Sequence, residues 1–422
     1  MKKTINKIGF CILAACFSLK TIQASPLSEV NVSPPIVRQS EDQPNPYAPL
    51  YQDILDRARR KGFPGLVALV RTPEEGTWIG TSGYARIEDR APMRPETLFW
   101  SESVAKTYTA AAVFMLRDQG LIDLDTKIDF YLPAAISDRV PNGHKATVRQ
   151  LLNHTSGIPE SDETHAIMRM WNNPYDWTWR DELEELSKEK PLFEPGTDRH
   201  YDNMNYLLLA LIIDELTGSH AGFFSMQIFQ PLEMWNTYYK NEPGMPRPAG
   251  LADIYFDRYG DGHIENITDE ICHLEHNSDY GFSGIVADMA DRARFIEALV
   301  KGGLISQDSW KEMTTPCLPG YEFEWAGAGL GMIPYTDNRG AKHIAYEGAG
   351  SGMPGFSYIF HMPSLGLTVC YSTNIASRNN ADLRTVFDQI RVDIIDVVMN
   401  QRAKRQAVGT AISRAKKKRK LG

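Results

Sequence analysis

The sequence has 422 residues, of which 42% are hydrophobic and 23% are charged. This composition is typical of a folded globular protein and excludes the disordered and fibrous classes. The net charge is −8, but residues 401–422 hold nine Lys and Arg and no acidic residue, so the remainder carries −17. An acidic body argues against a nucleic-acid-binding protein, whose binding face would be basic.

The N-terminus is typical of an exported protein. Three lysines within the first seven residues precede an apolar run, residues 8–19, which is too short to cross a bilayer as a stable helix. This arrangement predicts a secretory signal peptide. A linker over residues 25–49, which is rich in Pro and Ser, is expected to follow it.

Two processing sites remain open within this signal. Cleavage after Ala24, at a small-residue site, would remove residues 1–24 and release the protein into the periplasm. Alternatively, Leu13-Ala14-Ala15-Cys16 resembles a lipobox. Removal of residues 1–15 would then leave Cys16 lipidated, and the protein would be anchored to the membrane.

The first predicted elements are a helix and a hairpin. Residues 51–61 are expected to form a helix, and residues 65–71 a buried strand. A second strand over residues 77–85 follows a Gly-containing turn, which indicates a hairpin. A helix over residues 104–119 comes next, and Gly120 is a suitable residue for its C-terminal cap.

The later elements alternate between helices and strands. Helices are expected over residues 204–216 and 288–300, strands over residues 356–361 and 366–372, and a last helix over residues 382–399. Strands near both ends with helices between them predict a mixed α+β fold, in which both ends of the chain complete one sheet. The main domain is expected over residues 50–400. The basic tail, residues 401–422, is expected to be disordered and solvated, with contact to an anionic membrane surface as the alternative.

The pattern Ser-x-x-Lys occurs three times, and its surroundings separate the three. One copy, at Ser187, lies in a charged stretch, and another, at Ser413, lies in the basic tail. Only Ser103, with Lys106, stands at the start of an apolar helix. Because residues three apart share a helix face, the Lys106 amine can reach the Ser103 hydroxyl.

This pair can form an activated nucleophile. A serine hydroxyl reacts poorly until a neighbouring base takes its proton, and a buried amine of lowered pKa can act as that base. The start of the helix adds a positive dipole end and a backbone N–H that can face a developing oxyanion. The alternative interpretation, an N-capping serine followed by a surface lysine, is not excluded by the motif alone.

The pattern Tyr-x-Asn occurs at Tyr201-Asp202-Asn203 and at Tyr239-Lys240-Asn241. The first copy follows Pro195-Gly196-Thr197 and precedes an apolar helix. A phenol held near the lysine could move protons to the leaving group and activate water, and the amide could bind a substrate carbonyl. A buried tyrosine followed by a helix-capping asparagine is the alternative.

Taken in order, these motifs resemble the class C β-lactamase-like serine hydrolases, a superfamily that includes penicillin-binding proteins, DD-carboxypeptidases, D-aminopeptidases and family VIII-type esterases. The resemblance covers about residues 50–400. It implies a β-lactamase/transpeptidase-like fold, with an antiparallel sheet flanked by helices and an inserted helical region. The resembling segments are Ser103-Val104-Ala105-Lys106, residues 151–159, Pro195-Gly196-Thr197, Tyr201-Asp202-Asn203, residues 281–286 and Pro354-Gly355-Phe356-Ser357.

The resemblance also implies roles for individual residues. Ser103 would be the acylated nucleophile, Lys106 and Tyr201 would share the proton transfers, and Asn203 would orient the substrate. His154, in the His-Thr-Ser-Gly segment, is expected to be structural support rather than a base. No metal and no organic cofactor are implied.

The third motif of the family, Lys-Thr-Gly or His-x-Gly, is altered. Counted back from Pro354 it falls on Ala349-Gly350-Ser351, or one residue earlier, and neither register supplies Lys or His. Ser351 would then contact the substrate, and Gly352 would give the second N–H of the oxyanion site. Glu347 is expected to bring negative charge close to the site and to disfavour an anionic substrate.

This departure bears on the substrate. β-Lactams and D-Ala-D-Ala peptides carry a carboxylate that needs a cationic partner, so the loss favours esters or amides. The expected function is a serine hydrolase that acts through an acyl-enzyme on an ester, amide or β-lactam carbonyl. The alternatives are a β-lactamase or D-Ala-D-Ala carboxypeptidase, and a binding protein that has lost turnover. The partner would be a small-molecule or peptidoglycan-like substrate, with no nucleic acid.

Other candidate sites are weaker. The stretch Cys272-His273-x-x-His276 fits no strong zinc pattern, and a loop is expected there. Asp257, Asp261 and Glu265 lack the ligand spacing of a calcium loop and indicate a hairpin. Outside the signal, three scattered cysteines do not form a disulfide framework, and free thiols are expected at Cys272, Cys317 and Cys370.

Overall fold

The computed structural model describes part of the chain. The predicted signal peptide, both processing sites and nearly all of the predicted linker lie outside the described residues. The described ranges are 45–160, 178–239, 247–277, 280–317, 327–336, 340–377 and 381–421.

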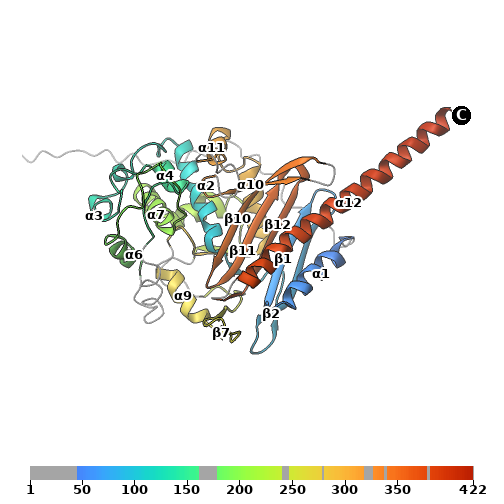
Figure 1. The fold of residues 1–422 in the computed structure, drawn as a ribbon, viewed down its shortest axis with the longest axis horizontal. Coiled ribbons are helices and arrows are strands. Elements are labelled where there is room, and N and C mark those ends of the chain that lie inside the picture. The colour runs from blue at the N-terminus through green and yellow to red at the C-terminus, as the bar shows by residue number, and fades with distance from the viewer. Residues whose placement is uncertain are drawn as a thin grey trace, which may run out of the picture. The chain divides into compact units, whose positions relative to one another are not determined.

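Seven strands form one antiparallel sheet, in the order β3-β2-β1-β12-β11-β10-β9 (Figure 1). β1 and β2 form the predicted hairpin, and β1 pairs on its other edge with β12, so strands from the two ends of the chain meet inside the sheet. The predicted α+β fold with an antiparallel sheet is therefore confirmed. In sheet order the strands are Ala91–Pro92, Gly76–Arg86, Gly65–Thr72, Leu367–Thr373, Gly355–Met362, Lys342–Gly352 and Gly331–Thr336.

Two helices cover one face of this sheet, α1 (Ala48–Arg59) and α12 (Ala381–Leu421) (Figure 1). Alternate residues of a strand face opposite sides of a sheet. In β1, Leu66, Ala68 and Val70 accordingly pack into the core beneath α1 and α12, whereas Val67 and Leu69 pack into the core on the other face.

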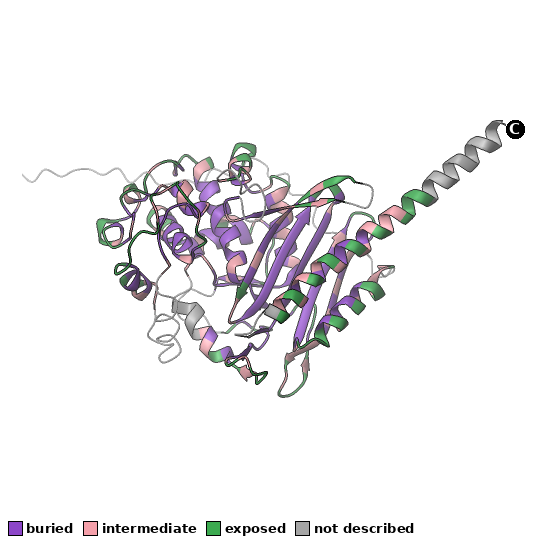
Figure 2. Ribbon diagram, viewed as in Figure 1, coloured by how far each residue is buried: buried purple, intermediate pink, exposed green. Residues whose placement is uncertain are grey.

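The opposite face is covered by α10 (Met289–Val300) and α2 (Ala105–Asp118), and α7 (Asn203–Thr217) packs against α2; all three correspond to predicted helices. Every residue of α7 from Met204 to Ile213 is buried, as expected for a helix that is apolar on all sides. Figure 2 shows the central strands buried between the two layers of helices. This second core positions the N-terminal end of α2, where Ser103 lies.

Two small sheets, β13-β6-β7 and β4-β8-β5, and several short helices complete the fold. β4 is the two-residue strand that leads into the Ser103 segment, and it pairs with β8. These remaining elements are β4 (Phe99–Trp100), η1 (Glu102–Val104), η2 (Ile128–Phe130), α3 (Ala134–Ser137), α4 (Val148–Leu152), α6 (Trp179–Leu186), α8 (His220–Phe224), η3 (Ser225–Phe229), β5 (Thr237–Tyr239), β6 (Tyr255–Asp257), β7 (Glu265–Asn266), α9 (Thr268–Asn277), β8 (Ile285–Ala287), α11 (Gln307–Met313), η4 (Pro363–Leu365) and β13 (Ile375–Ser377).

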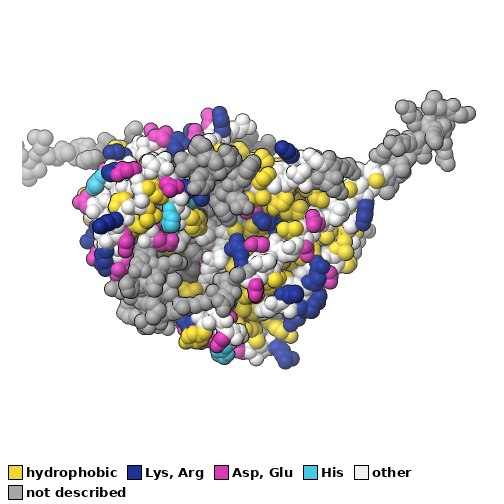
Figure 3. Space-filling view, viewed as in Figure 1, with side chains coloured by type: hydrophobic (Ala, Val, Ile, Leu, Met, Phe, Trp, Pro, Cys, Tyr) yellow, Lys and Arg dark blue, Asp and Glu magenta, His cyan; other side chains and the backbone are white. Residues whose placement is uncertain are grey.

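The C-terminal helix is longer than predicted. α12 continues from the sheet through Leu421, so the expectation of a disordered basic tail is wrong. Arg402 pairs with Glu74 at 2.6 Å and Arg405 pairs with Glu75 at 3.1 Å, which ties this part of α12 to the turn between β1 and β2. On the face seen in Figure 3, basic and acidic side chains are interspersed along the region of α1 and α12.

Within the described part of the chain, no single helix is both long and apolar enough to cross a membrane. One bent pair of segments, Asn203–Thr217 with His220–Phe229, meets that test by length and composition alone.

The buried His361 of β11 predicts an acid-sensitive contribution to stability. Burial lowers the pKa of His361 to about 4, from about 6.5 in an unfolded chain. Between these values only the unfolded state binds the proton, so stability falls as the pH falls from 6.5 towards 4, by about 3 kcal/mol for this group. We expect the difference in unfolding free energy between the unmodified protein and His361→Gln to shrink by about 2 kcal/mol between pH 7 and pH 4.5. Urea unfolding at the two pH values measures it, and an unchanged difference contradicts the prediction.

Candidate active site

Ser103 lies in a strained turn between β4 and α2. The preceding residue, Glu102, has a φ of 50°, in the left-handed region that non-glycine residues rarely adopt. Such strain persists only where the surrounding structure holds it, and it is concentrated at functional sites. Ser103 itself is partly exposed, so its hydroxyl is accessible at the start of the helix.

Lys106 is the predicted partner of Ser103, and the structure places the two side chains together. Its Nζ donates to Ser103 Oγ at 3.1 Å, although the lysine is only 3% exposed. Nζ also donates to Asn203 Oδ1 at 2.7 Å. The alternative of a surface lysine beside a capping serine does not fit, because the amine is buried and bonded to groups of both predicted motifs.

Asn203, the first residue of α7, holds its amide in one orientation. Its Oδ1 accepts from Lys106, and its Nδ2 donates to Glu160 Oε1 at 2.7 Å. Asp202 caps α7, accepting from Met204 N at 2.5 Å. Glu160, which follows the His-Thr-Ser-Gly-Ile-Pro segment directly, therefore belongs to the same hydrogen-bonded chain as Ser103.

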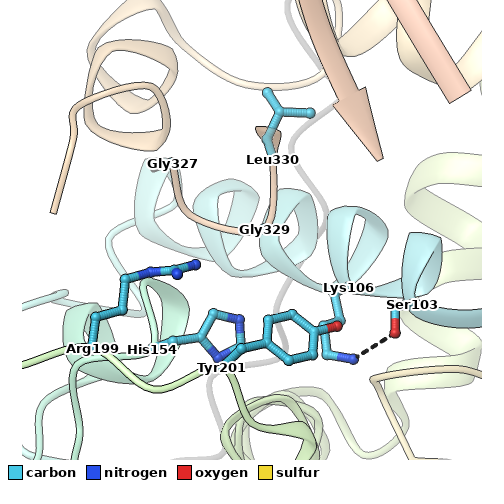
Figure 4. Close-up of a pocket in the computed structure, with 8 residues that line it drawn as sticks. All are labelled: Ser103, Lys106, His154, Arg199, Tyr201, Gly327, Gly329 and Leu330. Carbon is cyan, nitrogen blue, oxygen red and sulfur yellow. Dashed lines mark hydrogen bonds between the residues drawn. The ribbon is translucent and has the colours of Figure 1, made fainter. Parts of the chain in front are cut away.

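Tyr201 lies over the lysine. Its ring centroid is 4.9 Å from Lys106 Nζ, and Figure 4 shows its hydroxyl directed towards Lys106 and Ser103. The His154 ring packs against it, with centroids 4.6 Å apart. Tyr201 is 41% exposed, so the phenol can meet a substrate while its position beside the lysine is fixed by ring packing.

Burial and the neighbouring cations keep the His154 ring neutral, so that it can accept a hydrogen bond. Burial, together with the Lys106 cation, lowers the pKa of His154 well below its usual value. The neutral ring accepts a hydrogen bond at Nδ1 from Asp202 N, at 3.2 Å. Burial and the Glu160 carboxylate raise the pKa of Asp202 well above its usual value. His154 thus fixes the backbone that presents Tyr201, through its bond to Asp202 N.

Strand β10, which carries the altered third motif, passes directly beside the nucleophile. A side chain on Gly350 would place its Cβ 2.9 Å from Ser103 N and 2.6 Å from Ser101 O, so only glycine allows this approach. A Cβ on Gly352 would likewise lie 2.1 Å from Glu102 Oε2. β9 pairs with β10 only as far as Glu347. From Gly348 to Gly352, β10 pairs with β11 on one edge, and its other edge has no partner strand in the described sheet. That edge can present backbone N–H groups to a substrate oxygen.

Two expectations about side chains on β10 are not met. Ser351 pairs with Phe356, which packs into the core beneath α12, so strand alternation directs the Ser351 side chain away from Ser103. Glu347 is buried and accepts from Arg391 at 2.8 Å and from Tyr358 OH. The expectation that Glu347 brings negative charge to the site is wrong, because the Arg391 guanidinium compensates its carboxylate on the α12 side of the sheet.

A pocket opens over Ser103. Helix α2 positions one wall of this pocket, because Thr107 Oγ1 donates to Gly329 O at 2.7 Å. Gly329 is needed there, since a Cβ would lie 2.9 Å from Lys106 O. The lining residues are Ser103, Lys106, His154, Arg199, Tyr201, Gly327, Gly329 and Leu330 (Figure 4).

Sequence reasoning missed several of these residues. Arg199 gives the pocket a second cation besides Lys106. In Figure 4 it lies at the left, on the opposite side of His154 and Tyr201 from Ser103. Its position two residues before Tyr201 could have drawn attention to it. Glu160 is likewise adjacent to a recognised segment. Leu330 carries no sequence signal, because its loop reaches the pocket only through tertiary packing.

The remaining candidates have structural explanations. Ser187 ends α6 and donates to Glu184 O at 2.7 Å, whereas the side chain of Ser413 lies outside the described residues. In the second Tyr-x-Asn copy, the Tyr239 hydroxyl lies 2.9 Å from His220 Nε2. Lys240 and Asn241 lie outside the described residues. Asp257 bonds the backbone of the β6–β7 hairpin, as predicted.

No group of three or more potential metal ligands occurs among the described side chains. Cys370 is a buried free thiol, as expected. The predicted loop at Cys272 is instead α9, and the side chains of His273 and His276 in it are not described.

The fold combines a seven-stranded antiparallel sheet with a serine–lysine pair, Ser103 and Lys106, at the start of α2. A family model described as Beta-lactamase matches residues 50–389. The chain belongs to the Beta-lactamase family, as the sequence motifs predicted.

Related proteins carry several different names. A penicillin-binding protein of Bacillus subtilis (strain 168) is 28% identical over 302 residues, which are 67% of this chain and 63% of the relative. The chain thus spans less than two thirds of that relative's length. A D-stereospecific amidohydrolase from Streptomyces sp. is 26% identical, with a TM-score of 0.65 over 78% of this chain and 94% of the other. The D-amino acid amidase of Ochrobactrum anthropi SV3, complexed with L-phenylalanine amide, shares the fold at 23% identity, with a TM-score of 0.68 over 83% and 98%.

Proposed function

We propose that the protein hydrolyses esters or amides through an acyl-enzyme on Ser103. The observation that carries this proposal is the bond from the buried Lys106 Nζ to Ser103 Oγ, at 3.1 Å. A buried amine in contact with an accessible serine hydroxyl is the arrangement that nucleophilic acyl transfer requires.

The geometry supports the following steps. Ser103 Oγ attacks the substrate carbonyl carbon, and its proton passes to the Lys106 and Tyr201 pair. Backbone N–H groups of Ser103 and Gly352 hold the oxyanion. The leaving alcohol or amine takes the proton as its bond to carbon breaks. Water then attacks the acyl-enzyme, gives its proton to the same pair, and Ser103 regains its hydrogen as the acid departs.

The choice of esters and amides rests on β10. In both registers of the altered motif, the residues beside Ser103 on this strand are glycine, alanine and serine, which offer no charge to a substrate carboxylate. Asn203 is left as the polar group that orients a neutral substrate carbonyl or amide. The similarity to a D-stereospecific amidohydrolase supports an amide substrate.

A second candidate is hydrolysis of β-lactams or of peptides ending in D-Ala-D-Ala. The observation that favours it is Arg199, because a guanidinium lining the pocket can bind a carboxylate in two places. The similarity to a penicillin-binding protein supports it as well. In that case the substrate would be a peptidoglycan-like molecule with a carboxylate, instead of a neutral ester or amide.

We also propose that the protein is exported, as either a periplasmic enzyme or a lipoprotein. The lysine-rich start, the apolar run and the two cleavage sites support it. Growth with labelled palmitate should mark the unmodified protein and not Cys16→Ala if lipidation occurs. A protein unlabelled in both forms and cut after Ala24 would support release.

The decisive assay compares three substrate classes on one preparation. p-Nitrophenyl butyrate and D-phenylalanine amide should turn over, and ampicillin should turn over at least about tenfold more slowly in kcat/KM, since one missing ion pair costs over 1 kcal/mol. Arg199→Gln serves as the control that removes the pocket cation. Faster ampicillin hydrolysis that Arg199→Gln abolishes would overturn the neutral-substrate proposal in favour of the second candidate. An absence of turnover and of any adduct on Ser103 would indicate a binding protein.

A further inference from the structure

Arg292 of α10 is a buried cation close to the nucleophile that the proposed chemistry does not use. It is fully buried, with 0% exposure. Among the residues that the structure describes, its guanidinium bonds two hydroxyls and a carbonyl, and the Asp288 and Glu102 carboxylates act on it only from beyond ion-pair distance. Burial accordingly lowers the pKa of Arg292 to about 10. A buried guanidinium without a counter-ion is costly, and an apolar side chain would fill such space at lower cost.

The hydrogen bonds of Arg292 converge on the segment that delivers Ser103. Its Nη2 donates to Phe99 O at 2.6 Å. Its Nη1 donates to Ser372 Oγ at 2.6 Å and to Ser357 Oγ at 3.0 Å. Ser357 Oγ in turn donates to Trp100 O at 2.6 Å. The carbonyls of both residues of β4 are therefore held, directly or through Ser357, by this one side chain.

The held segment continues into the strained turn. Ser101 N donates to Ile285 O at 2.7 Å, and Glu102 then adopts its φ of 50° just before Ser103. β4 is only two residues long, so its own ladder gives little support. A strained turn keeps its geometry only if its surroundings over-determine it. The Ser103 N–H must also keep its direction towards the oxyanion, and a shift of about 1 Å at such a site can cost about 100-fold in rate.

We infer that Arg292 is a positioning residue for Ser103: its guanidinium pins the carbonyls of Phe99 and Trp100 so that the Glu102 turn presents the nucleophile and its N–H to the substrate. This inference rests on the proposed acyl-enzyme function. It also explains why the chain keeps a costly buried cation. One guanidinium can reach acceptors on β4, β11 and β12 together, and an apolar side chain can reach none of them.

An alkyl fluorophosphonate tests this inference without knowledge of the natural substrate. Ser103 Oγ attacks the phosphorus, fluoride leaves, and the serine proton passes to the Lys106 and Tyr201 pair. We expect Arg292→Met to lower the limiting rate constant of labelling at least tenfold, while the reagent concentration that gives half the limiting rate changes less than threefold. Arg292→Lys should give an intermediate rate, because an ammonium can bond the serine hydroxyls without also reaching Phe99 O.

Matched controls separate positioning from loss of structure. Arg294→Met removes a partly exposed arginine of the same helix, and it should label within twofold of the unmodified protein. Labelling is measured well below the melting temperature of each variant, so a purely structural role would lower the melting temperature and leave the rate unchanged. If Arg292→Met does not fold, Ser357→Ala, which removes the link to Trp100 O, should slow labelling at least threefold.

The outcomes are distinct. Labelling of Arg292→Met within threefold of the unmodified protein, or of Ser357→Ala within twofold where the methionine variant does not fold, overturns the inference. An unmodified protein that is not labelled on Ser103 overturns the proposed function instead. Slow labelling with an unchanged half-saturating concentration, in a variant that is folded at the assay temperature, supports Arg292 as the positioning residue.

Discussion

Ser103→Ala should abolish hydrolysis of p-nitrophenyl butyrate, with kcat reduced by roughly 10⁴-fold or more, because it removes the hydroxyl that is proposed to form the acyl-enzyme. The loss should come without unfolding. Ser103 is only partly buried, its Oγ accepts a bond from Lys106, and the strained Glu102 turn is held by backbone contacts that the substitution leaves in place. Steady-state kinetics gives the loss, and intact mass after fluorophosphonate treatment shows whether an adduct still forms.

The chain offers its own control for this substitution. Ser187 is also followed by a lysine three residues later, but it is exposed at the end of α6. Ser187→Ala should therefore retain full activity and the adduct. Residual activity of Ser103→Ala above about 1% of the unmodified protein, with kinetics independent of contaminants, would place the nucleophile elsewhere and refute the assignment.

Lys106→Met should lower kcat by roughly 10²- to 10⁴-fold, the contribution expected of one general acid–base group. Methionine has a similar length and can occupy the buried position, so most of the packing around Tyr201, Tyr206 and Phe282 should remain. What disappears is the donor that links Ser103 Oγ to Asn203 Oδ1. Because both acylation and deacylation need this group, kcat should fall more than KM rises.

Lys190→Met is the matched control, since Lys190 completes the exposed Ser-x-x-Lys copy and should change kcat by less than twofold. Burst kinetics gives a second readout for Lys106→Met. The unmodified enzyme should release product in a burst if deacylation limits turnover, and the variant should lose the burst because acylation has become slow. A variant with normal acylation would show that Tyr201 alone accepts the serine proton.

Sequence patterns predicted the parts of this molecule that depend on local spacing. The β1–β2 hairpin, α2, α7 and α10 follow from apolar periodicity and turn chemistry, and their observed limits differ from the predicted ones by at most a few residues. The contact of Lys106 with Ser103 follows from the geometry of one helical turn. The order of the motifs was sufficient to predict the family.

Features that depend on tertiary register were not predictable in the same way. The Ser351 side chain faces away from Ser103 because of its pairing with Phe356, and a shift of one residue would have reversed that. Glu347 was misjudged because its partner, Arg391, lies 44 residues away on α12. The bond between Asn203 and Glu160 joins two separate segments, and neither residue alone signals it.

The pairing of β1 with β12 has a consequence for when the site around Ser103 is assembled during synthesis. Leu66 lies opposite Thr373, so the middle of the sheet closes over about 300 residues of chain, a contact order that makes folding slow. Ser372, on that late strand, also bonds the arginine beneath the nucleophile. During synthesis, Ser103 is therefore made early but lacks its support until the chain through β12 has emerged. A growing chain therefore carries Ser103, Lys106 and Tyr201 before the strand that joins the two ends of the sheet has been made.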